Sequence, residues 1–301
     1  MITLEHVTRR FGQLTAIDDL TLSIGKGEIF GIVGADGAGK TTLLRMIIGI
    51  LEPTAGRITL LGSDKAEQVK SRIGYVPQKF SLYGDLTVRE NIAVMGALYG
   101  ADRETVAERG SAMLAFTNLL PFADRLADNL SGGMKQKLAL AAALMHRPEV
   151  FFLDEPTTGV DPVSRREFWQ ALYQLNKDGM TVVVSTPYMD EAELCTTVAF
   201  LSEGRVVACG SPADLKAAYP YHVLELTTDA KSLKQLLASG PIIDLNPFGE
   251  LYHIVTADVR EATAVIRCRL DEAGVSAYEL REITPQLEDV FVHLAQGGEK
   301  A

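Results

Sequence analysis

The segment GADGAGKTT, at residues 34–42, has the composition of a loop that binds phosphate. Gly34-x-x-x-x-Gly39-Lys40-Thr41 has the P-loop spacing, in which backbone N–H groups surround a phosphate, the lysine reaches the terminal phosphates and the hydroxyl holds Mg²⁺. A glycine turn before a purely structural helix is the alternative. The residues that we expect to bind nucleotide phosphate are Gly34, Asp36, Gly37, Ala38, Gly39, Lys40, Thr41 and Thr42.

An apolar segment at residues 151–155, FFLDE, ends in two adjacent carboxylates, Asp154 and Glu155. Adjacent residues on a strand face opposite ways, so these two carboxylates cannot share one role. Considered alone, the pair could be a solvated strand end. Its position behind a phosphate loop instead favours a functional pair.

Ser131, Gly132 and Gly133 form a turn directly before a segment rich in Ala, Leu and Lys. The free N–H groups and the positive dipole end at the start of a helix favour the binding of phosphate. Because residues 34–42 already supply one such site, this turn predicts a second phosphate-binding segment in the same chain.

The two phosphate-binding segments and the acidic strand end resemble the nucleotide-binding subunit of ABC transporters. LSGGMKQKLALA, GVDPVSRREFW, YMDEAE and PQLEDVFVHL are similar to the drug- and ion-exporter branch, especially to the first half of exporters with two ATPase domains in one chain. The resemblance implies a subunit that binds ATP and Mg²⁺ at a dimer interface and drives export through an integral-membrane permease. It also implies a cytoplasmic location, on the inner face of the membrane through the permease.

The resemblance implies catalytic roles at the chain's own phosphate loop. Glu155 would polarise the attacking water, with Gln78 and Lys40 as further catalytic residues. Thr41, Gln78 and Asp154 would hold Mg²⁺. Without the resemblance, Gln78 would be interpreted as a turn residue after a proline.

Other roles implied by the resemblance lie around the dimer interface and the base. Ser131, Gly132 and Gly133 would contact the ATP of a partner subunit, and Asp161 would lie in a loop that crosses the interface. Phe11 would stack on adenine, although an isolated Phe before a Gly is also a common core residue.

Pro187 departs from the family pattern. The family has a histidine that donates toward the γ-phosphate at this place, whereas this chain reads STPYMDEAE at residues 185–193. Proline offers neither a side-chain donor nor an N–H. Losing one preorganised donor typically costs about 10²–10³ in rate, so we expect a slow or degenerate site. The alternative is a tolerated variant in which water or the Thr186 hydroxyl takes the role.

The elements that position these residues follow from hydrophobic periodicity. Residues 2–11 and 16–24 alternate as antiparallel strands, and continuous apolar runs at residues 28–33, 150–155 and 180–186 are typical of buried parallel strands. Helices are expected at 40–51 and 163–179, and a helical subdomain at about 85–146. These elements predict an α/β P-loop NTPase core with an antiparallel β subdomain, over residues 1–219.

Residues 220–301 read as strand, helix, strand, strand, helix, strand, helix, with the first helix expected at 230–238. That order predicts a small α+β, ferredoxin-like domain with a closing helix. It contains no catalytic constellation, so we expect a role in assembly or regulation.

The bulk composition limits the choice of partners. A net charge of −10 disfavours nucleic acid. Three scattered cysteines show no metal or redox spacing, and the apolar runs are shorter than the ~20 residues that span a bilayer. Two alternatives stay open: a regulatory subunit with little hydrolysis, and a soluble ABC ATPase outside transport. The dimer could be a homodimer or a heterodimer, and Pro187 favours the latter.

Overall fold

The computed structural model describes residues 1–228, 233–237, 240–249, 251–275 and 277–297. The chain divides into two compact units, Met1–Ser211 and Pro212–Ala301. The division falls before the helix α7 (Pro212–Ala217) rather than after residue 219, because α7 packs against the last helix of the second unit. Over the described residues, every helix is too short or too polar to cross a lipid bilayer.

A six-stranded sheet forms the centre of the first unit, in the order β5-β6-β7-β3-β8-β9. Neighbouring strands are parallel except for the β8–β9 hairpin. Its strands are β3 (Ile29–Val33), β5 (Ile73–Val76), β6 (Val150–Asp154), β7 (Thr181–Thr186), β8 (Thr197–Ser202) and β9 (Arg205–Gly210). The order β6-β7-β3 brings the carboxyl ends of three strands together at one edge, where ligands bind in open α/β sheets.

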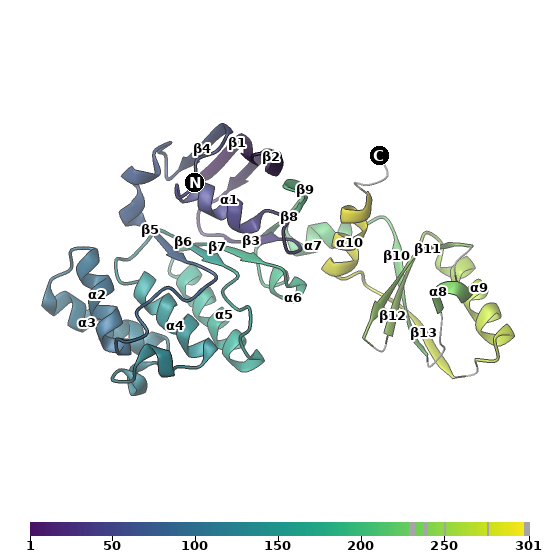
Figure 1. The fold of residues 1–301 in the computed structure, drawn as a ribbon. Coiled ribbons are helices and arrows are strands. Elements are labelled where there is room, and N and C mark those ends of the chain that lie inside the picture. Colours follow the sequence, from purple (N-terminus) through teal and green to yellow (C-terminus); the bar gives the residue numbers. More distant parts are fainter. Residues whose placement is uncertain (229–232, 238–239, 250, 276, 298–301) are drawn as a thin grey trace. The chain divides into compact units, whose positions relative to one another are not determined.

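A second, antiparallel sheet in the first unit has the order β2-β1-β4. It consists of β1 (Ile2–Phe11), β2 (Leu14–Ile24) and β4 (Ala55–Leu60). Helix α1 (Lys40–Ile47) lies between the two sheets, and its apolar residues join a core that both sheets share (Figure 1). The helix ends four residues before the predicted 51 because Gly49 turns the chain with a φ of +75°.

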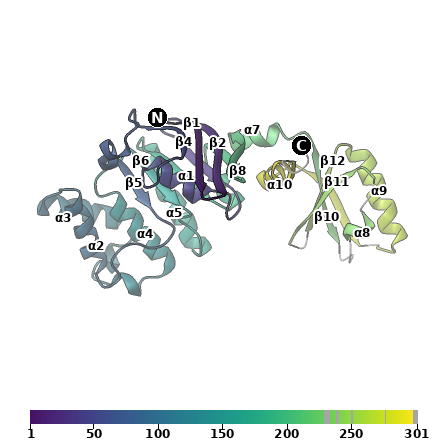
Figure 2. The same ribbon diagram turned by 45° about the horizontal axis from the view of Figure 1, so that its top comes forward.

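A helical subdomain follows β5, as the sequence predicts. Its helices α2, α3 and α4 pack against one another around their own apolar core (Figure 2). They are α2 (Val88–Leu98), α3 (Arg103–Phe116) and α4 (Gly132–Ala143), with 3₁₀ turns at Leu120–Phe122 and Ala127–Asn129. Thr87 and Glu90 form a capping box that fixes the start of α2. The unit also contains α5 (Pro162–Lys177), α6 (Met189–Ala192) and 3₁₀ turns at Ala66–Gln68 and Lys70–Arg72.

The second unit has the predicted order of elements. After α7 come β10 (His222–Thr228), α8 (Leu233–Leu236), β11 (Ile242–Phe248), β12 (Leu251–Thr256), α9 (Val259–Glu272), β13 (Tyr278–Ile283) and α10 (Leu287–Gly297). The sheet order β11-β12-β10-β13, with antiparallel neighbours, is that of a ferredoxin-like unit. Part of the helix predicted at 230–238 lies outside the described residues.

Candidate nucleotide-binding site

The phosphate loop connects β3 to α1 and requires its glycines. A Cβ at Gly34 would lie 2.3 Å from the carbonyl oxygen of Leu201, and one at Gly39 would lie 2.6 Å from that of Ala16. Gly37 and Gly39 have φ values of +82° and +107°. No side chain caps the start of α1, so its first N–H groups are free to face an anion.

The remaining predicted loop residues have different surroundings. Ala38 is buried beneath the loop and Thr42 is half-buried in the first turn of α1. Asp36, an unusual anion in a phosphate loop, has a side chain that is 93% exposed and lies 3.9 Å from Lys40. Because the Asp36 carboxylate points to solvent, it does not occupy the space that a phosphate needs.

Lys40 is buried and its ammonium group is fully paired. Its Nζ donates to the carbonyl oxygens of Gly34, at 2.9 Å, and Ala35, at 3.0 Å. It also lies 3.1 Å from Oε1 of Glu155. A buried ammonium requires such partners, since its desolvation is otherwise costly. The phosphate loop and the acidic strand end are therefore joined by one ion pair.

The two adjacent carboxylates contact different groups. Asp154 Oδ1 accepts hydrogen bonds from the hydroxyls of Thr41, at 2.9 Å, and Ser185, at 2.8 Å. Glu155 Oε2 instead accepts from the amide of Gln78 at 2.9 Å. Glu155 has a φ of +47°, which costs roughly 1–2 kcal/mol in a residue other than glycine. Its N–H is held by the Ser185 carbonyl, at 3.1 Å, and hydroxyl, at 3.0 Å.

The Thr41–Asp154 pair has the chemistry of a magnesium site. Mg²⁺ prefers oxygen ligands and is commonly held by one or two carboxylates beside substrate phosphates. The Thr41 hydroxyl and the Asp154 carboxylate already meet at 2.9 Å. Gln78 uses its amide nitrogen on Glu155, which leaves its amide oxygen for a cation. The donor set therefore fits the metal.

The Ser131 turn begins α4, and its two glycines differ. The Ser131 hydroxyl accepts from the N–H of Met134 at 3.3 Å and caps the helix. Ser131 and Gly132 are exposed, whereas Gly133 is buried against α5. A Cβ on Gly133 would lie 2.5 Å from the Cβ of Ser164. Gly133 therefore allows two helices to approach, a contact for which the sequence has no local signal.

We expect Gly133→Ala to destabilise the protein by about 1–3 kcal/mol, because the added methyl group overlaps Ser164. Gly132→Ala is the matched control, since its methyl group would meet only the Gly159 carbonyl oxygen at 3.6 Å. Urea unfolding of both variants measures the difference. Equal midpoints would show that the contact between α4 and α5 does not limit stability.

Asp161 caps α5 in this structure. Its carboxylate accepts from the N–H groups of Val163, at 3.1 Å, and Ser164, at 2.9 Å. These hydrogen bonds lower the pKa of the Asp161 carboxyl below its ordinary value. The side chain thus fixes the start of the helix that follows Gly159, and its role at a dimer interface stays a prediction.

Phe11 ends β1 and is 44% exposed, with the Arg9 guanidinium 4.5 Å from its ring centroid. The exposure rules out the core role that the sequence left open. An exposed aromatic face is able to stack on a base, so this role also stays a prediction.

Pro187 is half-buried directly after β7. The neighbouring Thr186 hydroxyl donates to Glu191 Oε2 at 2.6 Å and accepts from the N–H of Tyr188 at 3.1 Å. A hydroxyl has a single proton. In this arrangement that proton is used within the chain, and Thr186 has none to donate toward a phosphate.

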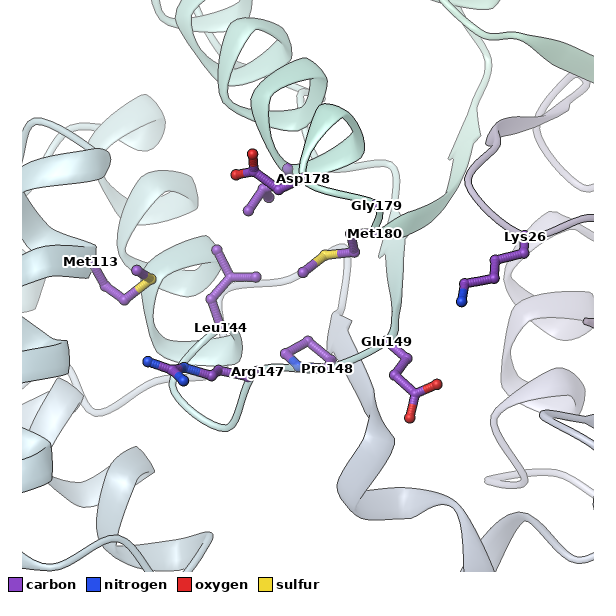
Figure 3. Close-up of a pocket in the computed structure, with 10 residues that line it drawn as sticks. Lys26, Met113, Leu144, Arg147, Pro148, Glu149, Asp178, Gly179 and Met180 are labelled. Carbon is purple, nitrogen blue, oxygen red and sulfur yellow. The ribbon is translucent and has the colours of Figure 1, made fainter.

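A cavity of about 480 Å³ lies at the opposite edge of the central sheet (Figure 3). Lys26 precedes β3, Glu149 precedes β6 and Met180 precedes β7, and all three line it. The cavity thus lies at the amino ends of the parallel strands, whereas the phosphate loop follows the carboxyl end of β3. It is separate from the candidate nucleotide site.

Comparisons with known proteins agree with this arrangement. A family model described as ABC transporter matches residues 17–158. The probable multidrug ABC transporter ATP-binding protein YbhF of Escherichia coli is 43% identical over 220 residues, which cover 72% of this chain and 38% of that protein. This chain therefore spans well under half the length of YbhF.

Two further relatives align with this chain over nearly their whole length. The Nod factor export ATP-binding protein I of Paraburkholderia xenovorans is 37% identical over 97% of this chain and 96% of its own length. A dimeric, post-hydrolysis structure of the ATP-binding cassette MJ0796 with ADP and Pi has a TM-score of 0.65 and 29% identity, over 70% of this chain and 98% of that one. The chain belongs to the family of ABC transporter ATP-binding proteins, the ATP-binding cassette ATPases.

Proposed function

We propose that this chain is the ATP-binding subunit of an exporter, and that it hydrolyses ATP at a dimer interface to drive an integral-membrane permease. The observation that carries the proposal is the meeting of Lys40, the Thr41–Asp154 pair and the Gln78–Glu155 pair at one sheet edge. The names of the relatives, a probable multidrug transporter protein and a Nod factor export protein, support export.

In the proposed mechanism the chain first binds the phosphates of ATP. The Lys40 ammonium and the free N–H groups of the loop and α1 face the phosphate oxygens. Thr41, Asp154 and Gln78 would hold Mg²⁺, which would neutralise part of the negative charge on the phosphates. Lys40 gives up its ion pair with Glu155 to reach the phosphates.

Glu155 then acts on the attacking water. While Lys40 Nζ lies 3.1 Å from Oε1 of Glu155, the ammonium occupies the side of the carboxylate that would face the attacking water. When Lys40 turns to the phosphates, the Glu155 carboxylate becomes free to accept a proton from water. Gln78, bonded to Glu155 at 2.9 Å, orients the same water.

The signature turn, Ser131-Gly132-Gly133, contacts the ATP of the partner subunit in this proposal. The exposure of Ser131 and Gly132 at the start of α4 supports that role. Pro187 favours a heterodimer, because a homodimer would repeat the same missing donor in both sites. The permease holds the complex on the inner face of the membrane, and residues 220–301 serve in assembly or regulation.

In such a heterodimer, we expect Ser131→Arg to lower total ATP turnover of the assembled transporter more than Lys40→Ala in this chain does. The first variant blocks the partner's complete site, whereas the second removes a site that is already slow. Steady-state ATPase measurements on the complex test the order. Ser111→Arg, at an exposed serine in α3, is the control for adding a large cation. The reverse order would contradict the asymmetric dimer.

A regulatory subunit that binds ATP with little hydrolysis is the second candidate, and Pro187 is the observation that favours it. Single-turnover hydrolysis on this chain's loop, with protein in excess over ATP, separates the two functions. Slow but complete conversion of bound ATP supports the first candidate. Bound ATP that is never converted supports the second.

A further inference from the structure

The carboxylate of Glu191, in α6, is buried and joins two separate segments. Only 1% of the residue is exposed. Its Oε1 accepts a hydrogen bond from the hydroxyl of Thr157, and its Oε2 accepts one from the hydroxyl of Thr186 at 2.6 Å. Both donors are themselves buried. The three residues therefore form a buried bridge between the segment that follows β6 and the last residue of β7.

The charge of this carboxylate is balanced by Arg165 in α5. Nε of Arg165 lies 3.5 Å from Glu191 Oε1, and Nη1 lies 3.2 Å from Asp190 Oδ2. The guanidinium also covers the ring of Tyr188, 4.5 Å from its centroid. Arg165 thus attaches the Glu191 bridge to the helix that Gly133 contacts through Ser164.

The two ends of the bridge adjoin the residues that place Glu155. Thr157 lies two residues after Glu155, and Thr186 directly follows Ser185. Ser185 holds the N–H of Glu155 at the point where Glu155 adopts its left-handed backbone. A strained conformation persists only where its surroundings determine it. The bridge fixes the backbone at Thr157, which follows Glu155, and at Thr186, which follows Ser185.

We propose that Glu191 is a positioning residue for ATP hydrolysis, which acts by holding the ends of β6 and β7 so that Glu155 points at the reacting water. This inference rests on the proposed function, because it concerns the rate of the step that Glu155 performs. Glu191 contacts neither Lys40 nor the phosphate loop through any described hydrogen bond or ion pair. Its effect is therefore on kcat and not on the KM for ATP.

Glu191→Ala tests the proposal in the assembled transporter, with the partner subunit's own site inactivated so that turnover reports this chain's phosphate loop. We expect kcat to fall about 10²-fold, the loss typical of a catalytic group displaced by about 1 Å, with an unchanged KM for ATP. Glu191→Gln should recover most of the rate. Its amide oxygen accepts from one threonine hydroxyl, and its amide nitrogen donates to the other.

A double-mutant cycle with Glu155→Gln separates positioning from general stability. If Glu191 acts through Glu155, Glu191→Ala causes no further loss of rate in the Glu155→Gln protein. Equal loss in both backgrounds, or an unchanged kcat in the single variant, overturns the proposal. A wild-type assembled transporter that hydrolyses no ATP on this chain's loop, or whose hydrolysis there is insensitive to Glu155→Gln, overturns the proposed function instead.

Glu225→Ala is the matched control, because Glu225 is also a buried carboxylate bonded to an arginine, Arg281, but lies in the second unit. It should lower the melting temperature without changing kcat. If Glu191→Ala does not fold, Thr157→Val and Thr186→Val each remove one hydroxyl from the bridge and keep the carboxylate. A lower kcat with unchanged KM in both supports the proposal, and an unchanged kcat in both overturns it.

Discussion

Replacing Glu155 with Gln is expected to slow ATP hydrolysis on this chain's phosphate loop by about 10²–10⁴ while ATP binding is retained. The glutamine side chain has the same size, and its amide oxygen can still accept from Gln78. It cannot accept a proton from water. The change also removes the negative charge 3.1 Å from Lys40, which frees the ammonium for the phosphates. ATP affinity should therefore be equal or higher.

Single-turnover hydrolysis and equilibrium binding of ATP, both in the assembled transporter with the partner subunit's own site inactivated, measure the two effects separately. Glu108→Gln is the control, because it removes an exposed carboxylate in α3, away from the candidate site. A Glu155→Gln protein that hydrolyses ATP within threefold of the wild-type rate would show that another group accepts the proton.

The fold could be predicted well because its signals are local. Continuous apolar runs identified β3, β6 and β7, and the spacing from Gly34 to Thr41 identified the loop that follows β3. The sheet order then brought the carboxyl ends of these strands together. Local signals are weaker at the ends of elements. Helix α1 ends earlier than predicted because Gly49 turns the chain, and α7 belongs to the second unit.

The features that could not be predicted depend on residues far apart in the chain. No spacing rule pairs Lys40 with Glu155 or places the Ser185 hydroxyl between Asp154 and the Glu155 N–H. Gly133 was interpreted only as part of a phosphate-binding turn, and its contact with Ser164 requires two packed helices. Such contacts follow from tertiary packing, so they can be identified only from the three-dimensional positions of the strand ends and helices.

Pro187→His is expected to raise the rate of hydrolysis on this chain's own loop by as much as about 10²–10³, since it restores one preorganised donor beside the γ-phosphate. The neighbouring hydroxyl does not supply that donor, because the Thr186 proton is bonded to Glu191 at 2.6 Å. Single-turnover hydrolysis in the assembled transporter, with the partner subunit's own site inactivated, isolates this loop.

Pro187→Ala separates the gain of a donor from the loss of the proline ring. It relaxes the backbone between Thr186 and Tyr188 in the same way but adds no side-chain donor. If histidine accelerates hydrolysis and alanine does not, the missing donor limits the site. If the two variants accelerate it equally, the rigid backbone after β7 is the limit, and the Glu191 bridge that fixes Thr186 becomes the element that sets the rate. If neither changes it, Pro187 is a tolerated variant, and the case for an asymmetric dimer loses its main support.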